Sequence, residues 1–114
     1  PMPGVVADAA FEQRLIAWHG VRLNEPDWSD NSHSIAFTVT SLTGNTRLHY
    51  MVNAWMEPLD FELEDNVNSP WKRWIDTAQP APKDIFTWDE VPRVTANHYT
   101  LRPYSIVVLV SFRK

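Results

Sequence analysis

The sequence predicts an all-β fold, an antiparallel β-sandwich with Greek-key-like connections and seven to eight strands. Three observations lead to this prediction. Apolar and polar residues alternate with a period of two in several segments of strand length. Nine prolines fall mostly between these segments, where a residue without a backbone N–H interrupts strands. Helical periodicity is nearly absent, apart from a turn or two expected in AAFEQRLIAW (9–18).

Residues 33–55 give the clearest local prediction, a β-hairpin. In HSIAFTVTSL (33–42), every second residue from His33 to Ser41 shares one face, and the β-branched content is high. TGN (43–45) supplies turn residues, with Gly44 able to adopt a positive φ. RLHYMVNAW (47–55) then alternates again.

The remaining strands are predicted from shorter or more apolar segments. YSIVVLVSF (104–112) carries β-branched or aromatic residues on both faces, which is typical of a strand covered on both sides or paired in the middle of a sheet. Four further candidates are RLIAWHGV (14–21), LDFEL (59–63), WKRWID (71–76) and HYTLR (98–102).

Length and composition indicate one soluble domain. A chain of 114 residues can bury a single core without disulfides, and it has no cysteine. We expect residues 1–14 to be a lead-in segment, either disordered or a short helix, and residues 15–114 to be the β-sandwich. The first ten residues lack the basic and long apolar regions of a signal peptide, so the expected location is cytoplasmic.

Several classes of partner are disfavoured. The net charge of −4 and the lack of any Lys/Arg cluster larger than WKRW argue against nucleic acid. No apolar run approaches the roughly 20 residues that span a bilayer, so no membrane partner is expected.

No catalytic, metal or cofactor site is predicted. The four histidines have no metal-ligand spacing, and neither a G-x-S-x-G elbow nor a glycine-rich phosphate loop occurs. The carboxylates lie in turn-like sequence and are interpreted as structural or solvated, with Asp76 expected to end a strand and cap a turn.

Six tryptophans are the most informative feature of the composition. An indole face can stack on a sugar ring, but tryptophan more often fills a core or a domain seam. If WKRW is extended, Trp71 and Trp74 lie on opposite faces of their sheet. They are the candidates for glucan stacking, with glycogen or a maltooligosaccharide as the ligand.

Longer stretches carry a resemblance to a known family. WHGVRLNEPDWSDNSHSIAF (18–37), LHYMVNAWMEPLDFEL (48–63), WKRWIDTAQPAPKDI (71–85) and YSIVVLV (104–110) occur in this order. Over residues 15–112 the chain resembles the C-terminal domain of bacterial glycogen debranching enzymes, in the isoamylase-like branch of the α-amylase superfamily. The resemblance implies a β-sandwich that follows a catalytic (β/α)₈ barrel in the same parent chain.

The resemblance also implies a function. The parent hydrolyses α-1,6 branch linkages in glycogen or limit dextrin, with its catalytic carboxylates on the barrel, so no catalytic residue is carried over to this chain. The first interpretation is a non-catalytic C-terminal domain that stabilises the barrel. The alternatives are an independent glucan-binding module that uses exposed tryptophans, and a small sandwich that serves as a protein-interaction unit.

PDWS (26–29) raises a question of its own, because a large indole lies in polar, turn-prone sequence. We expect Trp28 to pack inside the domain or at its seam with the barrel, while Asp27 and Ser29 hydrogen-bond the loop backbone. The ring of His33 is expected to fix the start of its strand by hydrogen bonding. A glucan-binding module predicts exposed coplanar aromatics, whereas a barrel-stabilising domain predicts aromatics that are buried or gathered on one patch.

Overall fold

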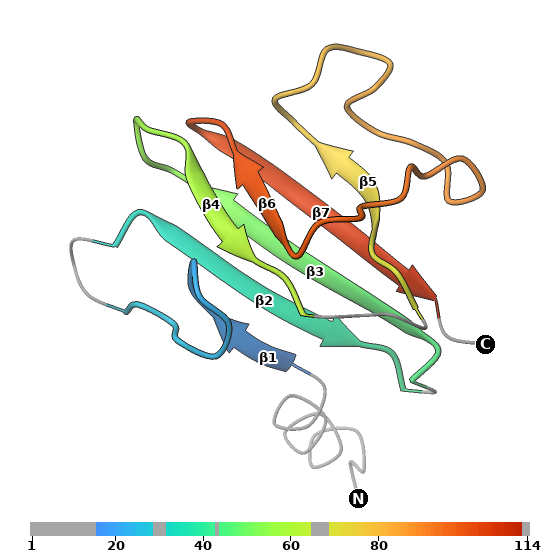
Figure 1. The fold of residues 1–114 in the computed structure, drawn as a ribbon, viewed down its shortest axis with the longest axis horizontal. Helices are drawn as coiled ribbons and strands as arrows, with labels where there is room; N and C mark the ends of the chain where they lie inside the picture. The colour runs from blue at the N-terminus through green and yellow to red at the C-terminus, as the bar shows by residue number, and fades with distance from the viewer. Residues whose placement is uncertain (1–15, 29–31, 43, 65–68, 113–114) are drawn as a thin grey trace, which may run out of the picture.

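The computed structural model describes residues 16–28, 32–42, 44–64 and 69–112, and every regular element within them is a β-strand (Figure 1). The strands are β1 (Ile16–His19), β2 (Ser34–Thr40), β3 (Thr46–Asn53), β4 (Leu59–Glu62), β5 (Lys72–Asp76), β6 (His98–Leu101) and β7 (Ser105–Phe112). They form a large sheet in the order β1-β2-β3-β7-β5 and a small sheet of β4 and β6. All pairings are antiparallel, which confirms the predicted fold class with seven strands.

The predicted hairpin is confirmed by the pairing of β2 with β3. Phe37 lies opposite Tyr50 and Thr38 opposite His49, so the two alternating patterns share their faces. Gly44 has φ 76° in the connecting turn, the positive value that glycine adopts without strain. The backbone N–H of Ser41 closes this turn on the carbonyl of Thr46 at 2.8 Å.

The other strand predictions hold, and the expected helical turns in 9–18 are corrected only for residues 16–18, since 9–15 lie outside the described residues. β7 lies between β3 and β5, as its apolar content on both faces predicted. The four shorter candidates contain β1, β4, β5 and β6. Ile16, Ala17 and Trp18 at the end of the expected helical turns belong to β1, because they pair with β2. The lead-in segment 1–14 lies outside the described residues. The described residues include no helix long and apolar enough to cross a membrane.

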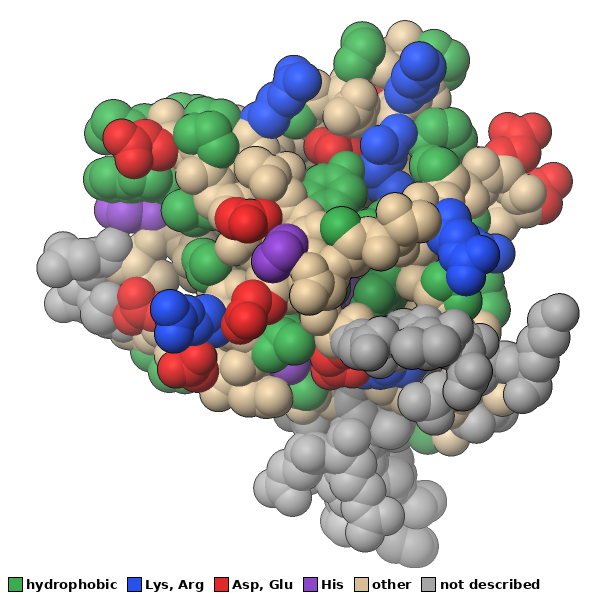
Figure 2. Space-filling model, in the orientation of Figure 1, with side chains coloured by type: hydrophobic (Ala, Val, Ile, Leu, Met, Phe, Trp, Pro, Cys, Tyr) green, Lys and Arg blue, Asp and Glu red, His purple; other side chains and the backbone are tan. Residues whose placement is uncertain are grey.

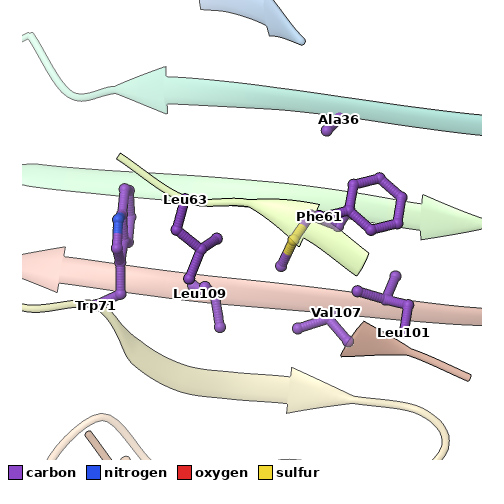
Figure 3. Close-up of a cluster of buried hydrophobic side chains, with 8 residues drawn as sticks. Ala36, Phe61, Leu63, Trp71, Leu101, Val107 and Leu109 are labelled. Carbon is purple, nitrogen blue, oxygen red and sulfur yellow. The ribbon is translucent and has the colours of Figure 1, made fainter. Parts of the chain in front are cut away.

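The hydrophobic core lies between the two sheets. In Figure 1 the small sheet lies in front of the large one, and Figure 3 shows side chains from both meeting in between. The buried cluster consists of Ala36, Met51, Val107 and Leu109 from the large sheet with Phe61, Leu63, Trp71 and Leu101. Burying one such large side chain contributes about 1.5–3 kcal/mol, so this cluster is the main stabilising contact between the layers.

A chain of hydrogen bonds runs beside this core on the same side of the large sheet. The backbone N–H of Asn24 donates to Nδ1 of His19 at 2.8 Å, so the proton of the neutral ring lies on Nε2. That Nε2 donates to Oγ1 of Thr38 at 3.1 Å, and the Thr38 hydroxyl donates to Nδ1 of His49 at 2.8 Å. The proton of His49 therefore lies on Nε2, a buried atom with no hydrogen-bond partner among the described residues.

Burial keeps His49 neutral. The pKa of the His49 ring is lowered from 6.5 to about 3, mainly by desolvation on burial, with smaller contributions from the nearby His19 and Arg47. The pKa of His19 is also lowered, mainly by burial. The unfolded chain takes up a proton at His49 near pH 6.5, whereas the folded chain does so only near pH 3. The contribution of the neutral ring to stability is therefore complete above pH 6.5 and is lost as the pH falls toward 3.

This shift predicts an acid sensitivity that one substitution should reduce. Between pH 6 and 4 the buried His49 adds a slope of about 1.4 kcal/mol per pH unit to the free energy of unfolding. His49→Asn keeps an acceptor for the Thr38 hydroxyl but cannot take up the proton, so the variant should lose less stability with falling pH, although it is less stable at pH 7. Urea unfolding at several pH values measures both. His98→Asn, at an exposed position, is the matched control. An identical dependence of the free energy of unfolding on pH in the unsubstituted chain and in His49→Asn would contradict the prediction.

Candidate functional site

The large sheet has a second face that points away from β4 and β6, and this outer face is mostly apolar. The strand register places Trp18, Phe37, Tyr50 and Val108 in one row across four neighbouring strands. The apolar and aromatic residues of the outer face on β1, β2, β3 and β7 are Ile16, Trp18, Ile35, Phe37, Val39, Leu48, Tyr50, Val52, Ile106, Val108, Val110 and Phe112. Thr46 and Lys72 are polar residues of the same face, opposite Phe112 and Val110. The inner side of the same strands also carries polar residues, among them Thr38, His49, Asn53, Ser105 and Ser111.

Among the described residues, the outer face is covered mainly near β5. Next to β5, the ring of Trp88 lies 5.2 Å from Phe112 and 5.3 Å from Trp74, measured between centroids. Val108 and Val110 are buried there. Trp18 on the edge strand β1, and Ile106 near the start of β7, are each 44% exposed. A sheet that is apolar on both sides is ordinarily covered on both sides, so the outer face is incomplete as it stands.

Four aromatic rings form a continuous cluster at the exposed end. Trp28 meets Trp18 edge-on at 5.3 Å with an interplanar angle of 70°, Trp18 lies 5.2 Å from Phe37, and Phe37 stacks on Tyr50 at 4.8 Å. Contacts of this kind are worth about 0.5–1.5 kcal/mol per pair beyond the area they bury. Trp28 is nevertheless 64% exposed, so it does not close off the core. This exposure disfavours the expected position inside the domain, which the stability of Trp28→Ala tests.

The neighbours of Trp28 were also predicted to be structural. Asp27 is exposed and, with Trp28, Ile35 and Val52, lines a shallow pocket of about 360 Å³ beside the outer face. Ser29 lies outside the described residues, so its hydrogen bonds to the loop remain a prediction.

The ring of His33 stacks on Trp55 at 4.4 Å with an interplanar angle of 14°. The backbone carbonyl of His33 accepts from the N–H of Ala54 at 2.8 Å, beside the start of β2. The hydrogen bond expected from the imidazole itself stays a prediction.

The two glucan-stacking candidates have different surroundings. Trp71 is 3% exposed in the core, donates from Nε1 to the carbonyl of Glu64 at 3.2 Å, and lies under the guanidinium of Arg47. This burial leaves no ring face for a sugar. Trp74 is half-buried and packs edge-on against Trp88. The two indoles thus lie on opposite sides of the large sheet, as the extended WKRW segment predicted.

The described carboxylates do not form a catalytic or metal-binding cluster. Among the described residues no group of three or more His, Asp or Glu side chains could hold a metal ion. Asp76 ends β5, and its Oδ1 accepts from the N–H of Ala78 at 3.0 Å, which confirms the predicted turn cap. Its Oδ2 accepts from the hydroxyl of Tyr99 at 2.6 Å. Burial raises the pKa of Tyr99 to about 12, and Asp76 contributes to the rise.

Sequence reasoning missed the outer face as a site. The signal was present in the hairpin, where the face of Ile35, Phe37 and Val39 carries larger apolar side chains than the face that enters the core. Each strand pattern was interpreted by itself, and only the register aligns these residues with Trp18, Tyr50 and Ile106 into one surface.

Comparisons with a family of protein domains and with individual proteins all identify isoamylases as similar to this chain. The family of isoamylase 1–3 C-terminal domains matches residues 17–109 of the chain. The chloroplastic isoamylase 1 of rice (Oryza sativa subsp. japonica) is 32% identical over 114 residues, covering 91% of this chain and 14% of the relative. The chloroplastic isoamylase SU1 of maize (Zea mays) is 29% identical, covering 90% of this chain and 14% of the relative.

A third relative, the chloroplastic isoamylase 1 of Arabidopsis thaliana, is 26% identical over 107 residues, covering 85% of this chain and 14% of the relative. The chain therefore spans about 14% of the length of the curated relatives it matches.

The placement of the tryptophans predicts unequal costs of truncation. Trp71→Ala should lower the free energy of unfolding by about 3–5 kcal/mol, because it leaves a cavity between the sheets. Trp28→Ala should cost less than about 1.5 kcal/mol, because it removes one exposed ring contact. Urea unfolding followed by circular dichroism compares the two variants directly. Equal losses would show that Trp28 supports this domain from within.

Proposed function

The chain belongs to the family of isoamylase C-terminal domains, and we propose that it is the non-catalytic C-terminal domain of a debranching enzyme whose catalytic barrel it stabilises. In this proposal the outer face of the large sheet packs against the barrel of the same parent chain. The parent hydrolyses α-1,6-glucosidic branch linkages in glycogen or limit dextrin, and the domain itself hydrolyses nothing.

The observation that carries the proposal is the uncovered apolar outer face. The small sheet covers the inner side of the large sheet, whereas Trp18, Trp28 and Ile106 remain exposed on or beside the outer face. Apolar area of this kind is removed from water in a stable protein, and each square ångström buried contributes about 25 cal/mol. A second layer of protein against the outer face therefore stabilises both partners.

The length of the relatives supplies a source for that second layer. The chain covers 14% of the rice and maize isoamylases, so most of each relative lies outside the matched domain. A (β/α)₈ barrel needs about 250 residues, more than twice the length of this chain. The layer that covers the outer face is therefore expected from the remainder of the same polypeptide.

The source and location of the parent are also part of the proposal. The chain resembles the domain of bacterial glycogen debranching enzymes, whereas the relatives reported above are plant proteins whose names include the word chloroplastic. We keep a glycogen debranching enzyme as the proposed parent, on the basis of the motifs WHG, PDWS and SHS near the start of the domain, and its cytoplasmic location stays a prediction.

An independent glucan-binding module is the alternative function. The exposure of Trp28 beside a shallow pocket is the observation in its favour. The rings of Trp18 and Trp28 meet at 70°, however, and so do not form the coplanar platform that stacks on successive sugar rings. An edge-on cluster gathered on one sheet face fits a protein–protein seam better.

The proposal predicts that a charge on the outer face acts only when the barrel is present. Ile106→Lys should lower the free energy of unfolding of the complete enzyme by about 2 kcal/mol or more, because it buries an unpaired charge in the seam. In the isolated chain the same change should cost less than about 1 kcal/mol, because the position is 44% exposed. Urea unfolding of both proteins measures the difference.

Thr100→Lys on the exposed side of β6 is the matched control, since it places the same charge on a strand of the small sheet. It should cost little in either protein. If Ile106→Lys costs the same in the enzyme and in the isolated chain, the outer face does not meet the barrel.

A further inference from the structure

A pocket of about 520 Å³ opens at the edge of the sandwich, between β5 and the segment that contains β6. We call it the arginine pocket, because three arginines line it: Arg73 of β5, Arg93 of the loop before β6, and Arg102 just after β6. Figure 2 shows Lys and Arg side chains gathered around the ends of these two strands. Thr95, His98 and Tyr99 contribute further polar atoms to its walls.

The arginine pocket is positively charged, whereas the whole chain has a negative net charge. Three arginines line it together with a single carboxylate, Asp76, although the chain has a net charge of −4. Both oxygens of that carboxylate already accept hydrogen bonds, from Tyr99 and from the backbone of Ala78. Among the described residues none of the three arginines forms an ion pair. Three guanidinium groups and one carboxylate leave the described lining of the pocket with an excess of positive charge.

Arg73 is held in place with one donor unused. Its guanidinium lies 5.4 Å from the ring centroid of Phe86, a cation–π contact that fixes the group. Its Nε is buried and has no hydrogen-bond partner among the described residues. Because this atom is closed to solvent, a ligand in the pocket would meet the other donors of the Arg73 guanidinium, and the cost of about 1–3 kcal/mol for the unpaired Nε is borne by the fold.

We propose that the arginine pocket binds the phosphoryl group of a phosphate monoester of the size of a monosaccharide phosphate. Guanidinium groups donate in a planar fork that matches phosphoryl oxygens, and bonds between them are charge-assisted and short. Three arginines on three separate segments can approach a group with three terminal oxygens from different sides, whereas a carboxylate offers only two. The volume of the pocket suits a small sugar, and the side chains of Thr95 and His98 are available for its hydroxyls.

The arginine pocket and the outer face are separate surfaces. Arg73 lies opposite Leu109, a residue of the inner side of the large sheet, and His98 and Tyr99 belong to the small sheet. A phosphate ester bound there does not compete with protein packed on the outer face. Ligand binding is thus a second property of the domain. Its test does not depend on whether the outer face packs against the barrel.

The test is a titration of the 114-residue chain followed by ¹H–¹⁵N NMR at pH 7.5, where a phosphate monoester is mostly dianionic. The probes are inorganic phosphate, glucose 6-phosphate and glucose, at an ionic strength held constant with sodium chloride. We expect saturable shifts at residues 93–102 with both phosphates and none with glucose. Arg93→Gln and Arg102→Gln, both at exposed positions, should each raise Kd about tenfold or more.

Arg22→Gln removes an exposed arginine outside the arginine pocket and should leave Kd unchanged. Shifts that do not saturate, or a Kd that Arg102→Gln leaves unaltered, would overturn the proposal. Binding of inorganic phosphate without binding of glucose 6-phosphate would overturn the assignment of the ligand as an ester.

Discussion

A sheet that is largely apolar on both faces needs two covering layers, and the described part of this chain supplies one of them. The small sheet, β4 with β6, closes the inner side over Phe61, Leu63 and Leu101. On the outer side the described residues contribute the contacts of Trp74 and Trp88 near β5 and of Trp28 on Trp18. This difference between the two sides decides the role of each aromatic residue. Those on the covered inner side stabilise the isolated domain, whereas those exposed on the outer side would be buried only by a further layer of protein.

The inner side shows a different solution to burial. It includes polar groups, but these are joined in sequence, from the backbone of Asn24 through His19 and Thr38 to His49. Each step has a defined donor and acceptor, so the chain of bonds links the loop after β1 to β2 and β3. Neutral histidines make this possible, and it couples the stability of the sandwich to pH. The outer side carries no comparable polar chain among the described residues, as suits a surface that another protein layer covers.

Local sequence patterns predicted the strands, whereas the surroundings of individual side chains depend on how strands far apart in sequence are paired. The period-two alternation of residues 33–55 and the doubly apolar run 104–112 were enough to place β2, β3 and β7. The surroundings of Trp28 and Trp71 could not be predicted in this way, because both depend on residues far away in sequence. Trp71 is buried by its contacts with His49 and Arg47, and Trp28 rests on Trp18. The arginine pocket combines residues from 73 to 102, a spacing that no sequence motif marks.

The central claim is that the outer face is exposed in the isolated chain and covered in the complete enzyme. The chain has no cysteine, so one thiol can be introduced at a chosen position within it, by Ile106→Cys on the outer face or by Thr100→Cys on β6. The most direct measurement is the rate of thiol alkylation, read by mass spectrometry of the corresponding peptide, in the isolated chain and in the complete enzyme. The thiol at position 106 should react readily in the isolated chain and at least about tenfold more slowly in the enzyme, while the thiol at position 100 should react equally in both. Equal reactivity of position 106 in the two proteins would contradict the central claim.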